Sequence, residues 1–207
     1  MFTSIGPEAV GKIHPAEFDL LCAPKNPRIS IRPAKVDDID EIYRIIHGNV
    51  SFAVAPPDVM RFAIAINRNN IVAFLRHGEI VGVYAMLMLS VRGLEAILVG
   101  DFDGRDPHGN QLVTRLERPA AIYQWLVVAP GLAAEGVMHV AALLQHPHYR
   151  AANLYMRSFS PAGARISTAL GFQPVPGAAL KGLHRYVRLT NRPTVADVPT
   201  HALPRAA

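Results

Sequence analysis

The chain has 207 residues, of which half are apolar or aromatic and 18% are charged, so it can bury a sizeable core and is not disordered throughout. The net charge of +5 favours acidic partners, but no run of Lys and Arg appears, so a nucleic-acid partner is disfavoured. The single cysteine, Cys22, excludes an internal disulfide and a metal site built from several cysteines, and it fits a reducing compartment.

The first residues, MFTSIGPEAV, contain no basic segment followed by an apolar stretch, so no secretion signal is expected. The longest apolar run, 80–90, is too short to span a bilayer. We therefore expect a cytoplasmic protein without a membrane partner.

Residues 1–27 are rich in proline and predict an extension that wraps the domain, with a short helix near Pro15–Cys22. The domain, 28–189, begins with a strand in which Ile29 and Ile31 alternate with polar residues. An amphipathic helix over 35–47 follows, with acidic residues in its first turn.

The next segment predicts a helix and a hairpin. The helix covers 57–66 and has Pro57 in its first turn. Two apolar strands, 71–76 and 79–89, flank a His77-Gly78 turn. Residues 91–119 break this pattern and are interpreted as an insertion that contains the polar loop GDFDGRDPHGNQ.

The remaining chain alternates strands and helices. A continuous apolar run predicts a central strand that is covered on both faces. The predicted elements are the central strand 120–129, a helix 131–145, a strand 153–159, a helix 160–172 and a last strand 183–189. Residues 190–207 are expected to be a flexible tail.

Antiparallel strands therefore come first, and a β-α-β crossover follows. The predicted fold class is α/β (α+β), with a mixed, mostly antiparallel central sheet and helices on both faces.

Three local patterns occur in an order that resembles the GNAT superfamily of acyl-CoA N-acyltransferases. IRPAKVDDIDEI at 31–42 is similar to the opening strand and helix of that family. LVVAP at 126–130 is similar to its central strand, and Leu170-Gly171-Phe172 to the end of its closing helix. The resemblance spans about residues 28–189.

The resemblance implies a co-substrate, acetyl-CoA or another acyl-CoA, and no metal. The pantetheine arm would pair with the backbone of a strand that parts from its neighbour, so the strand near 121–129 is expected to leave the strand near 152–159 in a V-shaped gap. The pyrophosphate would meet the amides at the start of the next helix. The implied cofactor-binding residues are Leu126, Val127, Val128, Ala133, Ala134, Gly136, Val137 and Met138.

The loop after the central strand departs from the family's Arg/Gln-x-x-Gly-x-Gly/Ala pattern. Only Gly136 matches a glycine of that pattern, and Met138 replaces a small residue. Glu135 adds a negative charge beside the pyrophosphate, which would cost about 1 kcal/mol unless the side chain points away. If coenzyme A binds, Glu135 should therefore be turned outward.

Proton transfer also departs from the family. Ser167 stands where many members have a tyrosine that protonates the departing thiolate, and a serine hydroxyl is much less acidic than a phenol. Tyr155 and Ser167 are the candidate catalytic residues. Tyr123 and Gln124 are the candidates for contacting the substrate, and Trp125 is expected in the core.

The insertion offers two interpretations. Its Asp101, Asp103, Asp106 and His108 resemble part of a calcium loop, but the complete pattern is missing, which favours a solvated turn. The insertion could instead form a lid on the acceptor side, near Tyr123 and Gln124, where its acidic groups would receive an amine.

The sequence is therefore compatible with three functions. The first is transfer of an acyl group, most simply acetyl, from acyl-CoA to the amine of a small molecule or a protein. The second is a GNAT-shaped binding or structural module without catalysis, favoured by the altered loop and by Ser167. The third is an RNA-directed acyltransferase or toxin. A homodimer is compatible with each.

Overall fold

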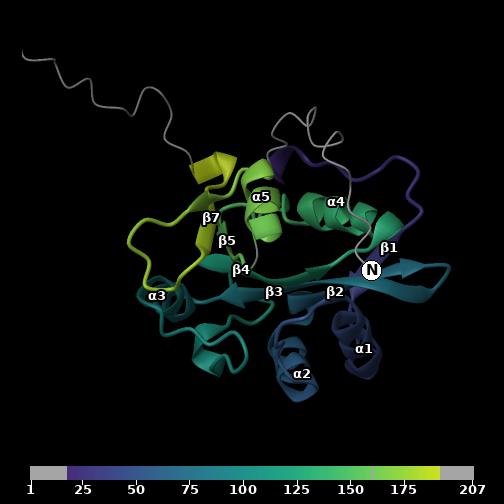
Figure 1. The fold of residues 1–207 in the computed structure, drawn as a ribbon, viewed down its shortest axis with the longest axis horizontal. Coiled ribbons are helices and arrows are strands. Elements are labelled where there is room, and N and C mark those ends of the chain that lie inside the picture. The colour runs from purple at the N-terminus through teal and green to yellow at the C-terminus, as the bar shows by residue number, and fades with distance from the viewer. Residues whose placement is uncertain (1–17, 160, 192–207) are drawn as a thin grey trace, which may run out of the picture.

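The computed structural model describes residues 18–159 and 161–191, and its strands form one seven-stranded sheet (Figure 1). The order across the sheet is β1-β2-β3-β4-β5-β7-β6, and every neighbouring pair is antiparallel except β4 and β5. The strands are β1 (Ser30–Pro33), β2 (Ile71–Arg76), β3 (Glu79–Leu89), β4 (Ala121–Val128), β5 (Asn153–Arg157), β6 (Gln173–Pro174) and β7 (Leu183–Tyr186). The predicted mixed, mostly antiparallel sheet is confirmed.

Helices cover both faces of this sheet (Figure 1). One face carries α1 (Ile39–Asn49), α2 (Pro57–Ile66) and α3 (Val91–Val99). The opposite face carries α4 (Ala134–Leu143) and α5 (Pro161–Ala169). Within the two described ranges, no helix combines the length and apolarity needed to cross a bilayer.

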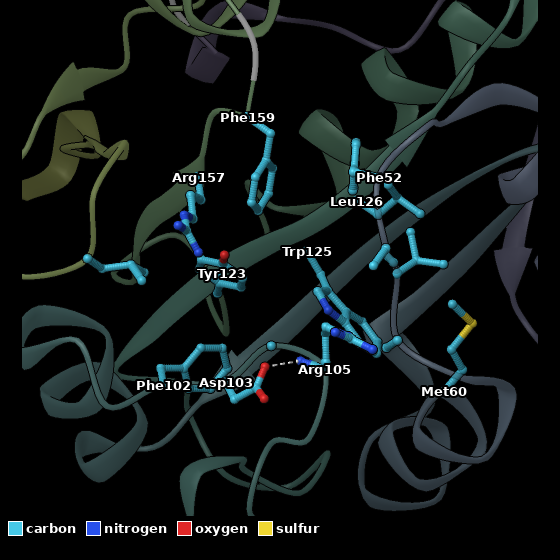
Figure 2. Close-up of a pocket in the computed structure, with 16 residues that line it drawn as sticks. Phe52, Met60, Phe102, Asp103, Arg105, Tyr123, Trp125, Leu126, Arg157 and Phe159 are labelled. Atoms are coloured by element: carbon cyan, nitrogen blue, oxygen red, sulfur yellow. Dashed lines mark hydrogen bonds between the residues drawn. The ribbon is translucent and has the colours of Figure 1, made fainter.

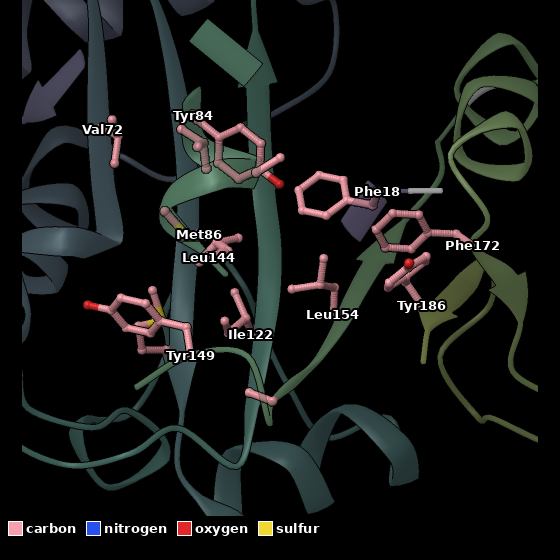
Figure 3. Packing of buried hydrophobic residues seen from close by; sticks show 14 of the residues in the cluster. Phe18, Val72, Tyr84, Met86, Ile122, Leu144, Tyr149, Leu154, Phe172 and Tyr186 are labelled. Atoms are coloured by element: carbon pink, nitrogen blue, oxygen red, sulfur yellow. The ribbon is translucent and has the colours of Figure 1, made fainter. Parts of the chain in front are cut away.

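The alternation of β3 explains why the chain needs both layers. Val83, Ala85 and Leu87 point to the face of α1–α3, whereas Tyr84 and Met86 point to the face of α4. Successive side chains of a strand point to opposite faces, so a continuous apolar strand has to be covered twice. Figure 3 shows the core on the α4 face, where side chains of β3, β4 and β5 meet Tyr149 and Phe172.

The predicted hairpin and the predicted helix 57–66 are confirmed at their stated bounds. His77 (φ 52°) and Gly78 (φ 89°) adopt the left-handed conformation of a two-residue hairpin turn.

Helix α3, which opens the insertion 91–119, was not predicted. Ser90 caps this helix by accepting a hydrogen bond from the Gly93 amide at 3.2 Å, and Gly100 (φ 88°) ends it. These two residues and the helical spacing of Leu94, Ile97 and Leu98 were the signal.

The described part of the N-terminal extension is anchored in the α4 face of the domain. Phe18 is fully buried, with its ring 6.3 Å from that of Phe172 and 6.1 Å from that of Tyr186 (Figure 3). The short 3-10 helix Phe18–Leu20 lies within the predicted helix near 15–22, and residues 1–17 lie outside the described residues.

A buried ion pair fastens this anchor to the end of β7. The Nε atom of Arg188 lies 2.8 Å from Oδ1 of Asp19, and the two side chains are only 1% and 4% exposed. The geometry at Nε is not that of an aligned hydrogen bond, so the contact is chiefly an attraction between charges. Arg188 Nη2 also donates to the Leu144 carbonyl at 2.9 Å, and Asp19 Oδ2 accepts from the Leu189 amide at 2.9 Å.

The start of the predicted tail is also fixed. Thr190 donates to the Arg150 carbonyl at 2.9 Å, and Asn191 donates to Asn153 at 3.0 Å. The rest of the predicted tail, 192–207, lies outside the described residues.

Two glycines on the α4 face have no room for a side chain, Gly136 on α4 against β2 and Gly82 on β3 against β4. A Cβ at Gly136 would lie 2.5 Å from ring atoms of Phe74, and a Cβ at Gly82 would lie 2.6 Å from the Val128 carbonyl oxygen. Real Cβ atoms do not come this close to other heavy atoms, so the phenyl ring of Phe74 dictates glycine at 136.

We expect Gly136→Ala to lower the free energy of unfolding by about 1–3 kcal/mol, because the Phe74 ring is buried and must move with its neighbours. Denaturant titration measures this. Gly48→Ala is the control, since Gly48 is an exposed position of α1 with nothing near its Cβ, and it should be neutral or stabilise by up to ~1 kcal/mol. Equal effects of the two changes would contradict the packing role of Gly136.

We expect Asp19→Asn to lower the free energy of unfolding by about 3 kcal/mol, because it leaves the buried guanidinium of Arg188 without its counter-charge. Asp106→Asn is the control, since that carboxylate is exposed and joins none of the ion pairs among the described residues, and it should change stability by less than ~0.5 kcal/mol. An Asp19→Asn protein as stable as wild type would show that the extension is not anchored through this pair.

Candidate active site

The strands β4 and β5 are paired along only part of their length. Parallel pairing runs from Ala121↔Asn153 to Gln124↔Met156, after which β4 continues to Val128 without β5 beside it. The backbone of Trp125–Val128 therefore has no strand partner on the β5 side. The two strands are therefore not paired along the full length of β4, as the predicted gap requires.

A β-bulge in β4 lies at the point where the gap opens. On β3, Ala85 pairs with Leu126 and Met86 pairs with Gln124, so Trp125 is the extra residue of the bulge. The bulge breaks the alternation of the strand, and Tyr123, Trp125 and Leu126 all reach the same pocket on the α1–α3 face. Gln124 points to the opposite face, where it accepts a hydrogen bond from the Tyr84 hydroxyl at 2.8 Å.

This pocket lies at the mouth of the gap and encloses about 160 Å³, close to the volume of a cavity that accommodates benzene (Figure 2). Its walls come from the α1–α2 loop, α2, β3, the insertion, β4, β5 and the segments after β5 and β6. The lining residues are Phe52, Ala53, Val54, Ala55, Met60, Ala85, Phe102, Asp103, Gly104, Arg105, Tyr123, Trp125, Leu126, Arg157, Phe159 and Leu180.

Aromatic rings form most of the rim and one wall. The Phe52 and Phe159 rings stack with centroids 5.0 Å apart, although they come from the α1–α2 loop and from the segment after β5. The Phe102 and Tyr123 rings meet edge to face at 5.3 Å. These contacts tie the insertion and the α1–α2 loop to the open end of the gap, as expected for edge-to-face and stacked ring pairs.

Three charged residues line the same pocket. The Arg157 guanidinium carbon lies 4.9 Å from the centroid of the Phe159 ring, and Nε of Arg157 donates to the Lys181 carbonyl at 3.0 Å. Asp103 Oδ1 accepts from the Arg105 amide at 2.8 Å, which closes a turn in the loop of the insertion (Figure 2).

The insertion packs where the sequence analysis expected it to, over the pocket beside Tyr123. It does not approach the side chain of Gln124, because that side chain lies across the sheet. Trp125, expected in the core, is only partly buried and forms part of the pocket wall. Trp125 still packs against two of the buried clusters, so the expectation is met in part, and the sequence gives no sign of the bulge that brings the residue to the pocket.

Burial makes the phenols of Tyr84 on β3 and Tyr123 on β4 harder to ionise. Desolvation raises the pKa of Tyr123 to about 12, although the positive charge of Arg157 acts in the opposite direction. Desolvation also raises the pKa of the Tyr84 phenol, on the other face of the sheet. At neutral pH both tyrosines are therefore proton-bearing groups rather than bases.

The start of α4 is free of side-chain caps. A 3-10 turn over Gly131–Ala133 leads into the helix, and no side chain of the described residues caps the first amides of either segment. Ala133 is buried and Ala134 is exposed, while Val137 and Met138 are partly buried. An uncapped helix start is compatible with an anion, because its amides and the helix dipole both favour negative charge.

Glu135, in the first turn of α4, is held by Arg28. Its Oε2 accepts from the Arg28 amide at 3.1 Å, and its Oε1 accepts from Nε of Arg28 at 2.8 Å and from Nη2. The backbone amide and the guanidinium of Arg28 together lower the pKa of this carboxyl. The charge at 135 is thus paired with a cation rather than presented alone to the helix start.

The candidate proton donors lie away from the pocket. Tyr155 is 4% exposed and packs in the core with Leu183 and Ala96. Ser167 is buried in α5, where its hydroxyl donates to the Gly163 carbonyl at 2.7 Å. Neither residue lines the pocket, so both assignments remain predictions, without support from the geometry.

Sequence reasoning did not find Phe52, Arg157 and Phe159. Arg157 and Phe159 lie at and just after the end of β5, whereas Phe52 comes from the distant α1–α2 loop, and only the tertiary fold brings it to them. Within the described ranges, no three His, Cys, Asp or Glu side chains are grouped as metal ligands.

Comparison with solved structures identifies the fold. A GNAT-family acetyltransferase from Streptococcus agalactiae superposes with a TM-score of 0.50 at 13% identity, over 77% of this chain and 95% of that one. Ard1 from Thermoplasma volcanium gives 0.48 at 10% identity over 76% and 95% of the two chains, and the GphF GNAT-like decarboxylase in complex with isobutyryl-CoA gives 0.45 at 16% over 67% and 71%. No protein-family model and no curated protein sequence matches the chain. The chain has the fold of the GNAT superfamily of acyl-CoA N-acyltransferases.

We expect the folded protein to lose stability between pH 10 and pH 12 through Tyr123. A phenol whose pKa is raised in the folded state stabilises that state below its ordinary pKa of 10.0, and this contribution is lost as the pH rises through about 12. Between these pH values, wild type should lose roughly 2 kcal/mol more unfolding free energy than Tyr123→Phe. Denaturant titration at several pH values measures this, and parallel pH profiles would show that Tyr123 ionises normally.

Proposed function

We propose that this protein is an acyl-CoA-dependent N-acyltransferase that most simply transfers an acetyl group to an amine. The observation that carries the proposal is the gap between β4 and β5, which opens at the bulge at Trp125 and has an aromatic pocket at its mouth. An extended pantetheine arm needs free backbone groups of this kind, and the acceptor needs a separate pocket that reaches the same point.

Each partner would have its own side of the sheet. The acyl-CoA would lie along Leu126–Val128, with its pyrophosphate at the amides of 133–138, at the start of α4. The acceptor amine would enter from the α1–α3 face, past Asp103 and Tyr123. Binding both in the same gap would supply much of the rate through proximity and orientation.

The reaction needs a neutral amine. Its nitrogen attacks the thioester carbonyl, the C–N bond forms and the C–S bond breaks. The nitrogen gives up one proton and the leaving thiolate takes up one, so the products are the amide and coenzyme A. The exposed carboxylate of Asp103 could attract the amine as an ammonium ion before it loses a proton to solvent. Tyr123 bears a proton at neutral pH and lies on the acceptor side.

A module without catalysis is the second candidate, and the placement of Ser167 and Tyr155 outside the pocket supports it. A single measurement distinguishes the two candidate functions, namely the binding of acetyl-CoA followed by titration calorimetry. A non-catalytic module that has lost the co-substrate should show no binding at millimolar acetyl-CoA. The RNA-directed activity, the homodimer and the cytoplasmic location remain predictions of the sequence.

We expect wild type to bind acetyl-CoA and Arg28→Gln to bind it about fivefold more weakly, because the change releases the negative charge of Glu135 beside the helix start. Glu135→Gln should bind modestly more tightly than wild type, since it removes that charge and leaves Arg28 unpaired. The double variant should regain at least wild-type affinity.

Arg44→Gln serves as the charge-matched control for this series. Arg44 lies on α1, on the other face of the sheet, so its loss should leave the affinity unchanged. If all four variants bind acetyl-CoA as wild type does, the pyrophosphate lies elsewhere and the alignment of this loop is wrong.

A further inference from the structure

The aromatic pocket combines apolar walls with two arginines that have no carboxylate partner among the described residues. Among the ion pairs of residues 18–159 and 161–191, none engages Arg105 or Arg157. The one acidic residue in the lining, Asp103, leaves the pocket with an excess of one positive charge over its three charged residues. A pocket of this composition favours a ligand that is apolar and carries a negative group.

Arg157 is oriented before any ligand arrives. Its Nε donates to the Lys181 carbonyl at 3.0 Å, and its guanidinium carbon lies over the Phe159 ring, 4.9 Å from the ring centroid. Figure 2 shows its terminal nitrogens directed toward Tyr123, into the pocket. A guanidinium held in this way binds a carboxylate with little loss of side-chain entropy, and its fixed geometry matches two oxygens.

The rings of Phe52 and Phe159, which lie near Arg157, are only partly buried by the protein. Phe52 and Phe159 stack on each other, yet they remain 40% and 57% exposed at the mouth of the pocket. The volume of about 160 Å³ suits one six-membered ring. A ligand ring inserted between these side chains and Trp125 would remove apolar surface from water on several sides.

We propose that the acceptor is an amine that carries an aromatic ring and a carboxylate, as an aromatic amino acid does, with Arg157 as the carboxylate anchor. This inference rests on the proposed function, because the amine is assigned the role of the acyl acceptor. Asp103 lies across the pocket from Arg157 and would attract the ammonium group (Figure 2). The aromatic side chains of the pocket wall would contact the ring of the ligand.

Trp125 makes the pocket directly observable. It is the only tryptophan in the chain, and it forms part of the pocket wall, so ligand binding should change its fluorescence. Four probes separate the chemical groups in the absence of coenzyme A: L-phenylalanine, 3-phenylpropionate without the amine, phenethylamine without the carboxylate, and L-alanine without the ring. We expect L-phenylalanine and 3-phenylpropionate to bind at least about tenfold more tightly than phenethylamine and L-alanine.

Variants at Arg157 test the anchor. Arg157→Gln should lower the affinity for 3-phenylpropionate by about tenfold or more, and its affinity for phenethylamine should stay within about twofold of that of wild type. Arg157→Lys keeps the charge without the planar fork and should fall between wild type and Arg157→Gln. Arg76→Gln removes one charge at the exposed end of β2, outside the pocket lining, and should bind every probe as wild type does.

Several outcomes would overturn the proposal. Equal affinity for L-phenylalanine and phenethylamine would show that the pocket does not recognise the carboxylate. Equal affinity for L-phenylalanine and L-alanine would show that it does not recognise the ring. Equal losses in Arg157→Gln and Arg76→Gln would show a general charge effect. If Arg157→Gln does not fold, the affinities of wild type for the four probes and those of Arg157→Lys still test whether Arg157 binds the carboxylate.

The proposed function is tested separately by thiol release from acetyl-CoA. L-Phenylalanine should raise this rate above that with L-alanine. Probe binding without acetyl-CoA binding would contradict acyl transfer and leave the ligand class standing. Acetyl-CoA turnover that is faster with L-alanine than with L-phenylalanine would overturn the ligand class and leave acyl transfer standing.

Discussion

The single extra residue in β4 is the constraint on which the site depends. Because Trp125 has no partner on β3, the strand changes its twist there, and its next residues run clear of β5. The same bulge places Trp125 and Leu126 on one face, so that the wall of the pocket and the free backbone edge start at the same point. A regular strand would have sent these two side chains to opposite faces and continued the sheet.

Packing on the α4 face holds the start of α4 and the N-terminal segment against the sheet. On the α4 face, the Phe74 ring fills the space that Gly136 and Gly82 leave open, which fixes the start of α4 against β2 and β3. The only glycine that matches the family's phosphate loop is therefore also required by packing. On the same face, Phe18 and the Asp19–Arg188 pair fasten the N-terminal segment over the core.

Charge is distributed differently on the two faces. At the start of α4, Arg28 pairs with Glu135, so a negative charge that looks unfavourable in the sequence is compensated by a residue 107 positions away. In the pocket, Arg157 is held by a carbonyl and a ring but by no carboxylate among the described residues. A charge that is paired with an opposite charge fits a structural role. A charge that is oriented but unpaired fits a role in binding a ligand.

The sequence by itself determined the elements whose periodicity is strong and local. The hairpin 71–89, the helix 57–66, the central strand and the succession of strands and helices along the chain all follow from apolar spacing, turn residues and caps, which act over a few residues. Tertiary structure alone decided the rest. Whether Trp125 or Gln124 faces the pocket depends on a bulge set by pairing with β3, and the meeting of Phe52 with Phe159 depends on packing between loops that are over a hundred residues apart. Long-range contacts of this kind leave no local pattern, so the residues that form the pocket could not be read from the chain.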